Sequence, residues 1–216
     1  MSEEKTTKKY SVKKYYDNVN VGKRTKQVVC LCEEQDKAAM FEFYLGRNEN
    51  KKNVVLVKSK RRADELFSYL NSKDIKATAI HGNHRKEQLQ KAEKEFNEGE
   101  INILITTDKI LQSLELKNIE TIINYDLPPE HEDYFSRLML VDEVGESISF
   151  VSPQDEVYLE IIEIRLKNEI PQESLEGFEP TNENNKTHIA KEKKNKPRHR
   201  NRKTRKVVKP EDKDEE

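Results

Sequence analysis

Short apolar runs alternate with longer amphipathic segments between residue 26 and about residue 167. Six of these runs are short and rich in β-branched side chains, which is typical of strands. The predicted strands are 28–32, 54–57, 76–80, 101–106, 121–125 and 147–151. Several are apolar almost without interruption, as a sheet covered by helices on both faces requires.

Between the predicted strands, apolar positions recur at helical spacing. One helix is predicted from Ala63, Leu66, Phe67 and Leu70, a second from Leu89, Ala92 and Phe96, and a last one from Tyr158, Ile161, Ile162, Arg165 and Leu166. Segments 36–45 and 132–141 carry shorter patterns. The alternation of strands and helices predicts a single doubly wound α/β domain with a mostly parallel sheet.

In such a sheet, ligands meet the loops at the carboxyl ends of the strands. These loops begin at 58–60, 81–83, 106–108 and 126–128, and they hold most of the small and polar residues. After Pro171 the hydrophobicity falls to a level that does not offset the entropy of ordering. We therefore expect a disordered segment over 1–14, the α/β domain over 15–180, and a disordered basic tail with an acidic end over 181–216.

The formal net charge of −1 hides an uneven distribution. Residues 186–209 hold 12 Lys and Arg against one acidic residue, Glu192, which gives this arm a charge of +11 and the remainder −12. A basic arm on an acidic body is typical of a nucleic-acid-binding tail. The predicted phosphate contacts of the arm are Lys193, Lys194, Lys196, Arg198, Arg200, Arg202, Lys203, Arg205 and Lys206. A solvated tail that only aids solubility is the alternative.

The two cysteines and the amino terminus restrict the cellular setting. Cys30 and Cys32 alternate along a predicted strand and share one face, so they do not form the spaced cage that zinc requires. We expect reduced thiols, no metal and no cofactor. No run approaches the ~18 apolar residues of a membrane span, and residues 1–5 have no apolar signal region. These features predict a cytoplasmic protein without membrane contact.

A series of motifs follows the predicted strands in a fixed order. They are NVVLVKSKRRADEL at 53–66, AIHGN at 79–83 with Phe96 and Gly99 after it, ILITTD at 103–108, IINYDLP at 122–128 with Asp133 and Tyr134, and SFVS at 149–152. Over residues 20–180 this order resembles the second, C-terminal RecA-like domain of DEAD-box RNA helicases, and within that family the bacterial RhlE-like branch with basic tails. The resemblance implies a single RecA-like doubly wound domain.

The departures from the family pattern fall where the family places charges toward ATP. Motif V normally continues Arg-Gly-Leu-Asp, and the matching positions run from Gln112 to Glu115. Motif VI, His-Arg-x-Gly-Arg-x-Gly-Arg, keeps only its first arginine. The degenerate ATP-site positions are Gln112, Glu115, Arg137, Leu140 and Glu143. Because arginine fingers contribute roughly 10³–10⁵ in rate, we expect no intrinsic ATPase activity and no catalytic residue. The alternative is that Arg137 reaches the ATP site.

The sequence contains no Gly-x-x-x-x-Gly-Lys-Thr phosphate loop and no Asp-Glu-Ala-Asp segment. We therefore expect this chain to lack the half of a helicase that grips the nucleotide. RNA contact is a separate property, because the family's C-terminal domain holds the sugar-phosphate backbone through loop groups. The resemblance implies this role for Ser59, Gly82 and Thr107, with Lys60 and Arg61 beside them.

A structural interpretation of the same loops stands beside the functional one. Thr107 and Asp108 would cap the helix that follows, and His81 would satisfy a buried partner. The two interpretations are compatible, since a helix amino terminus with exposed N–H groups is itself an anion site.

The sequence thus predicts a non-catalytic RNA-binding protein derived from a helicase C-terminal domain. Its expected partner is single-stranded or ribosomal RNA, bound with low sequence specificity. One alternative is the C-terminal half of an ATP-dependent RNA helicase that works with a separate N-terminal RecA-like chain. Another is an interaction scaffold for a helicase or a ribonuclease.

Overall fold

The structure is a computed structural model, and it describes residues 25–48, 51–141 and 145–181. These residues form one six-stranded sheet in the order β1-β6-β5-β2-β4-β3, in which every pair of neighbours is parallel. The strands are β1 (Lys26–Leu31), β2 (Asn53–Leu56), β3 (Thr78–Ala79), β4 (Ile103–Thr106), β5 (Thr121–Asn124) and β6 (Glu146–Val151). The sheet is wholly parallel, whereas the sequence predicted a mostly parallel one.

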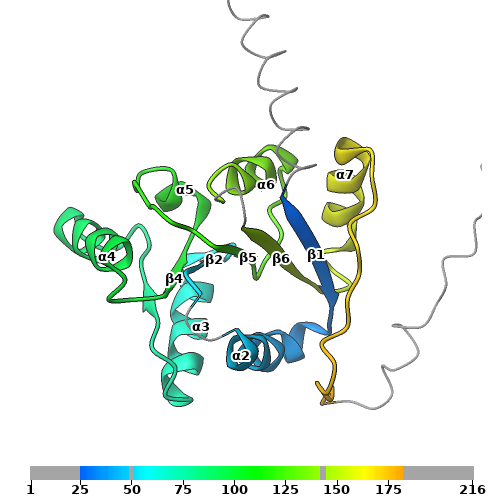
Figure 1. Cartoon of the computed structure of the whole chain (residues 1–216), viewed down its shortest axis with the longest axis horizontal. Coiled ribbons are helices and arrows are strands. Elements are labelled where there is room, and N and C mark those ends of the chain that lie inside the picture. Colours follow the sequence, from blue (N-terminus) through cyan, green and yellow to red (C-terminus); the bar gives the residue numbers. More distant parts are fainter. Residues whose placement is uncertain (1–24, 49–50, 142–144, 182–216) are drawn as a thin grey trace, which may run out of the picture. The chain divides into compact units, whose positions relative to one another are not determined.

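Helices cover both faces of the sheet (Figure 1). The helices are α2 (Lys37–Arg47), α3 (Lys60–Ser72), α4 (Lys86–Glu98), α5 (Asp108–Leu111), α6 (His131–Leu138) and α7 (Glu156–Leu166), and a short 3-10 turn, η1 (Glu34–Asp36), precedes α2. Helices α2 and α3 pack on one face, and α4 to α7 pack on the other. The chain thus winds outward to β3 and back to β6, which confirms the doubly wound α/β class.

The central strands have the burial that their apolar sequences predict. All four residues of β2, β4 and β5 are buried, because helices cover both faces. The edge strand β3 keeps only two residues of the predicted 76–80, since it pairs with β4 alone. The helix expected after Thr107 is present as α5, which has only four residues and is therefore too short to show a periodic apolar pattern.

The last helix presents a different face to the core from the one predicted. Leu159, Ile162 and Leu166 are buried against the sheet, whereas Ile161 and Arg165 are exposed. Phe67 on α3 is likewise 37% exposed, although the sequence placed it on the buried face. Helical spacing alone did not decide between faces, because apolar residues occur on more than one side of these helices.

The segment after α7 returns along the outer edge of β1. Pro171 accepts a hydrogen bond from the Val29 amide at 2.9 Å, and the Glu173 amide donates to the Val29 carbonyl at 2.9 Å. Farther on, the Thr181 hydroxyl donates to Asp36 Oδ1 at 2.5 Å. This segment covers the edge of β1, which would otherwise present unpaired backbone groups.

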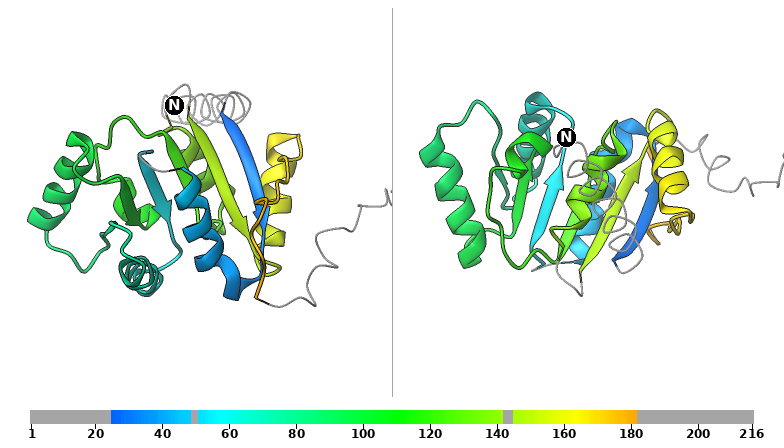
Figure 2. Two further views of the ribbon diagram at one scale, coloured as in Figure 1. Left: turned by 60° about the horizontal axis from the view of Figure 1, so that its bottom comes forward. Right: turned by 90° about the horizontal axis from the view of Figure 1, so that it is seen from above.

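Figure 2 shows α4 and α7 at opposite ends of the sheet. No helix within the described residues is long and apolar enough to span a membrane.

Candidate nucleic-acid interface

The loops that follow β2, β4 and β3 lie next to one another, because these strands are consecutive in the sheet. All three loops leave the carboxyl edge of the sheet, where ligands of such folds bind. They carry Ser59, Thr107 and Gly82 in turn, so the structure brings together the residues that the resemblance selected. Ser59 and Gly82 are exposed and Thr107 is half-buried.

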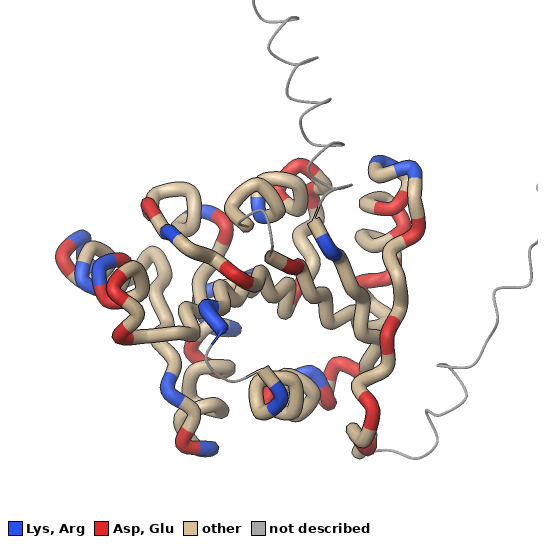
Figure 3. Tube along the Cα trace, viewed as in Figure 1, with Lys and Arg blue, Asp and Glu red and all other residues tan. Residues whose placement is uncertain are grey.

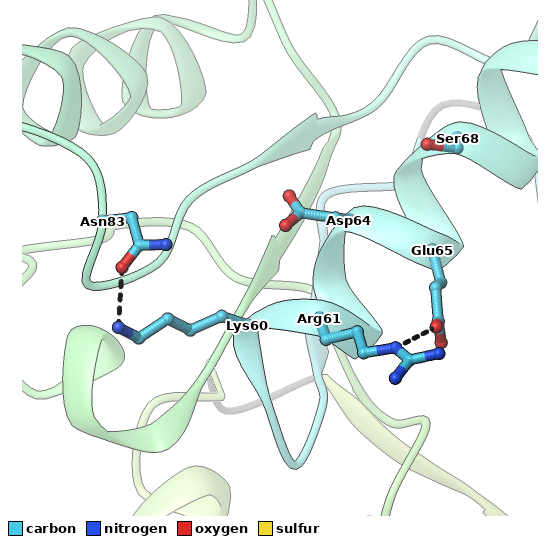
Figure 4. A pocket seen from close by; sticks show the side chains of 6 residues that line it. All are labelled: Lys60, Arg61, Asp64, Glu65, Ser68 and Asn83. Atoms are coloured by element: carbon cyan, nitrogen blue, oxygen red, sulfur yellow. Dashed lines mark hydrogen bonds and ion pairs between the residues drawn. The ribbon is translucent and has the colours of Figure 1, made fainter.

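The amino terminus of α3 is built around Ser59. Its hydroxyl oxygen accepts a hydrogen bond from the Arg62 amide at 3.2 Å and so caps the helix. Lys60 extends away from the helix, and its Nζ donates to Asn83 Oδ1 at 2.7 Å (Figure 4). Arg61 is bound only to Glu65 on the same helix, at 2.8 Å, and remains largely exposed.

Lys60 and Asn83 thus join the loop after β2 to the loop after β3. A shallow hollow of about 750 Å³ lies beside them, lined by Lys60, Arg61, Asp64, Glu65, Ser68 and Asn83. Figure 4 shows Lys60 and Arg61 reaching from the first turn of α3 toward different partners. The hollow carries both signs of charge, with cations toward the loop edge and carboxylates along α3.

His81 supports the loop from within the fold. It is buried, its Nε2 lies 2.9 Å from Asp64 Oδ1, and its backbone amide donates to His84 Nδ1 at 3.1 Å. The structural interpretation of His81 holds only in part, because His81 itself is buried while its partner Asp64 is exposed. The His81 ring also accepts a hydrogen bond from the Asn83 amide at 3.4 Å and so supports the turn that contains Gly82.

Thr107 and Asp108 behave differently from the predicted helix caps. Thr107 occupies the N-cap position of α5 but makes no side-chain capping hydrogen bond. The Asp108 carboxylate instead binds the guanidinium of Arg137, with both distances at 2.7 Å. The capping interpretation is therefore wrong for both side chains, because a stronger bidentate partner captures Asp108.

Arg137 is fully enclosed in the protein. Only 1% of its surface is exposed, and its Nη1 donates to Asn124 Oδ1 at 2.9 Å and to the Asp126 carbonyl at 3.0 Å. Together with the bidentate pair to Asp108, these bonds engage all three nitrogens of the guanidinium. Arg137 therefore fixes α6 against the ends of β4 and β5, and protein groups bind its guanidinium on every nitrogen.

The other degenerate positions are on the surface. Gln112 ends α5 and is exposed, and Glu115 accepts a hydrogen bond from Asn97 through its carbonyl at 2.9 Å. Leu140 is 36% exposed after the end of α6. Glu143 and the predicted phosphate contacts of the basic arm lie outside the described residues.

A buried ionic cluster at the same sheet edge was missed by sequence reasoning. Lys37 is completely buried, and its Nζ lies 2.5 Å from Asp155 and 3.6 Å from Asp126. Arg62 reaches Asp126 at 3.5 Å and also pairs with Glu34. The only signal in the sequence was a lysine inside an amphipathic helix, and its partners lie far away along the chain.

The cluster favours the charged forms of Asp155 and Lys37. Burial opposes ionisation of Asp155, but the hydrogen bond and charge of Lys37 outweigh it and lower the pKa of Asp155. Burial likewise opposes the charge on Lys37, yet Asp155, Asp126 and Glu34 raise its pKa. The pairing therefore compensates the desolvation of the ions, as burial of charge requires.

The side chains of Cys30 and Cys32 lie on the same face of the sheet, as predicted. Cys30 is buried in the core between the sheet and α2, and Cys32 packs against that core from the end of β1. Burial raises the pKa of Cys30 to about 11 and that of Cys32 to about 12. Both thiols are therefore protonated and unreactive near neutral pH. Within the described ranges no group of three or more His, Cys, Asp or Glu side chains is arranged to hold a metal.

Comparison with known proteins supplies the context for this geometry. Residues 35–139 match the family described as the helicase conserved C-terminal domain. The chain is 32% identical over 148 residues to the ATP-dependent RNA helicase vasa of Drosophila melanogaster, a match that covers 67% of this chain and 19% of vasa. It thus spans about a fifth of the length of that relative.

Two solved structures share the fold. A DEAD box protein from Methanococcus jannaschii superimposes with a TM-score of 0.66 and 28% identity, over 71% of this chain and 43% of its own. The E. coli DEAD-box protein SrmB, in a structure bound to the regulator of ribonuclease activity A, gives a TM-score of 0.67 at 19% identity. This match covers 73% of this chain and 95% of the SrmB chain. Residues 35–139 are therefore similar to the helicase conserved C-terminal domain, and the described part of the chain has the RecA-like fold seen in the C-terminal domains of DEAD-box RNA helicases.

Proposed function

We propose that this domain is a non-catalytic RNA-binding module. It holds the sugar-phosphate backbone of single-stranded RNA across the loops after β2, β4 and β3, and it supplies no cation to ATP hydrolysis. The basic arm at 186–209 adds sequence-independent attraction to phosphates. The loop contacts are inferred from the resemblance to the helicase family. The lack of a cation for ATP is inferred from the burial of Arg137 in this structure.

The observation that carries the proposal is the enclosure of Arg137. Phosphoryl transfer depends on cationic groups at the developing charge, because the protein has little covalent chemistry to do. Arg137 is the single arginine kept from motif VI, and Asp108, Asn124 and the Asp126 carbonyl bind its guanidinium. Gln112, Glu115 and Leu140, the other degenerate positions within the described residues, are exposed, and none of them carries a positive charge. This arrangement favours a domain that has kept its fold and no longer contributes to ATP turnover.

The loops are suited to a backbone and not to a base sequence. Ser59 and Thr107 offer hydroxyl groups, the turn at Gly82 offers backbone amides without a side chain in the way, and Lys60 and Arg61 offer charge. Contacts of this kind position a strand but carry no sequence information. We therefore expect similar affinity for single strands of different base composition, with strong dependence on salt.

RNA binding by the full chain tests the proposal directly. Anisotropy of a labelled single-stranded oligouridylate is measured for the parent protein and for the double variant Lys60→Ala, Arg61→Ala. The matched control is Lys91→Ala, Lys94→Ala, which removes the same charge from the outer face of α4. We expect the first variant to bind several-fold more weakly and the control to bind like the parent. Equal affinity of both double variants would reject the loop interface.

ATP turnover tests the catalytic half of the proposal. The full chain is assayed for ATP hydrolysis with and without RNA, and Arg137→Lys serves as the variant that would abolish any turnover dependent on that residue. No turnover above the buffer rate is expected in either condition. RNA-stimulated hydrolysis by the parent chain would overturn the non-catalytic assignment.

The alternative function is the C-terminal half of an ATP-dependent RNA helicase that works with a separate N-terminal RecA-like chain. The 32% identity to vasa, an ATP-dependent RNA helicase, favours it. It predicts that the chain raises the RNA-stimulated ATP turnover of an isolated N-terminal RecA-like domain. Unchanged turnover across a titration of this chain counts against it.

A further inference from the structure

Helix α7 is apolar on two sides. Seven of its 11 residues are apolar, and only Leu159, Ile162 and Leu166 among them are buried against the sheet. A second set, Val157, Ile161 and Ile164, is 61%, 38% and 69% exposed. These three residues follow i, i+4, i+7 spacing and therefore form one stripe along the outer side of the helix.

The stripe is the main concentration of exposed apolar side chains in the described residues. Among the described residues, six large apolar side chains are exposed, and three of the six belong to α7. A helix that is apolar around most of its circumference is normally covered by a partner. Below we call Val157, Ile161 and Ile164 the α7 stripe.

Acidic residues surround the α7 stripe. Glu156 and Glu160 flank it on the helix, Arg165 and Lys167 stand at the end of the helix, and residues 168–181 carry Glu169, Glu173, Glu176 and Glu179 without a basic residue. Figure 3 shows these acidic positions along α7 and the segment after it, with basic positions only at the end of the helix. The partner that fits this surface is a basic segment with apolar side chains at helical spacing.

We propose that the chain's own residues 8–21 occupy the α7 stripe. This segment places Val12, Tyr16 and Val19 at i, i+4, i+7, which is the spacing of the stripe itself. Residues 5–24 hold seven Lys and Arg against one acidic residue, Asp17. The basic arm at 186–209 is a poorer match, because it has charge without an apolar pattern.

The connection to β1 allows this docking within one molecule. Gln172, six residues after α7 ends, pairs with Val29 in parallel, so the end of α7 lies at the same sheet edge as the start of β1. Figure 1 shows the end of α7 beside that start. Val19 is six residues before Thr25, which permits a reach of roughly 20 Å, and an 11-residue helix is about 16 Å long.

A single tryptophan provides the test, because the chain contains none. In the full chain, Tyr16→Trp places a reporter at the centre of the proposed contact. We expect emission at shorter wavelength than that of free tryptophan and protection from acrylamide quenching. Adding Ile161→Ser with Ile164→Ser removes both effects, whereas the matched control Phe67→Ser, an exposed apolar residue on α3, leaves them unchanged.

Two further measurements keep the outcome decisive. Lys13→Glu with Lys14→Glu changes no residue of the described α/β domain, and we expect it to abolish the blue shift while the circular dichroism of the domain stays like the parent's. A concentration series separates docking within one molecule from association of two copies. A blue shift independent of protein concentration supports the proposal. Solvent-exposed emission from Trp in the Tyr16→Trp protein without further substitutions, or a blue shift that grows with concentration, overturns it.

Discussion

The two halves of the α/β domain, residues 25–109 and 110–181, differ in charge far more than in structure. Residues 25–109 hold 16 Lys and Arg against 14 Asp and Glu, whereas residues 110–181 hold four against 17. In the first half, Lys60 and Arg61 are exposed at the loop edge. In the second half, Arg137 is buried in an ion pair with Asp108. Both halves contribute parallel strands to the same sheet, so the fold does not dictate the difference.

The difference in charge separates two properties, attraction of RNA and supply of cations to ATP. Exposed cations on the β2, β4 and β3 loops attract a polyanion, whereas a half with a net charge of −13 repels it. RNA should therefore stay on the first half. Arg137, which the sequence resemblance assigned to the ATP site, belongs to the second half, where Asp108, Asn124 and the Asp126 carbonyl bind it.

The largest effect is expected from removing the enclosed arginine. Arg137→Ala leaves the carboxylate of Asp108 and the side-chain oxygen of Asn124 without their donor, and breaking such a buried pair costs about 3–5 kcal/mol. The free energy of unfolding in urea measures this destabilisation. Arg165→Ala, which removes an exposed arginine of the same half, should cost less than about 0.5 kcal/mol. Equal costs for the two variants would mean that Arg137 is not structural.

The buried cluster should make stability depend on acid. The folded pKa values of Asp155 and Glu34 are lowered, so their contribution is present above about pH 4, near their unfolded values, and disappears as the pH falls through the folded values. Chemical unfolding between pH 6 and pH 2 measures this. Lys37→Met, which keeps the length of the side chain, should destabilise by about 3 kcal/mol near neutral pH.

The same variant gives the control for the acid dependence. Without Lys37, burial raises the pKa of Asp155 and only the hydrogen bonds from Ser152 oppose it, so protonation becomes easier and acid should weaken the domain less in this window. An identical acid profile in the parent and in Lys37→Met would show that other carboxylates are responsible.

Deleting residues 186–216 should weaken RNA binding by roughly tenfold at moderate salt, because the arm carries a charge of +11 over residues 186–209. The slope of log affinity against log salt should fall by ~0.7 for each phosphate that the arm no longer neutralises. Anisotropy titrations at several salt concentrations give both values. The double variant at Lys60 and Arg61 should lower the slope further in the truncated chain. A slope that the deletion leaves unchanged would assign the binding to the loops alone.

Two substitutions of Ser59 distinguish its role as a helix cap from its role as an RNA contact. Their effects are expected to be the smallest of this series. Ser59→Ala removes the acceptor for the Arg62 amide and should cost ~1 kcal/mol of stability. Ser59→Asp keeps a cap of similar strength but places a negative charge at the loop edge. Thermal unfolding should therefore be affected mainly by the first variant and RNA affinity mainly by the second. If Ser59→Asp binds RNA with the affinity of the parent, the RNA does not contact the loop at Ser59.

Local patterns were sufficient for the elements and for the loops that the fold brings together. The apolar runs at β2, β4 and β5 identified central strands, because a sheet covered on both faces leaves no polar positions in them. Ser59, Gly82 and Thr107 follow adjacent strands, so their common edge followed from the fold class. The capping roles of Thr107 and Asp108 were wrong, because the competitor for Asp108 is on another helix.

The sequence by itself determined the alternation of strands and helices, the carboxyl-edge loops and the uneven charge, since each is a property of neighbouring residues. Only the tertiary structure decided that Arg137 binds Asp108 across 29 positions, that Lys37 binds Asp155 across 118, and that α7 buries one apolar side and exposes the other. These outcomes depend on which side chains the packed sheet brings within hydrogen-bonding distance, and spacing along the chain carries no information about that.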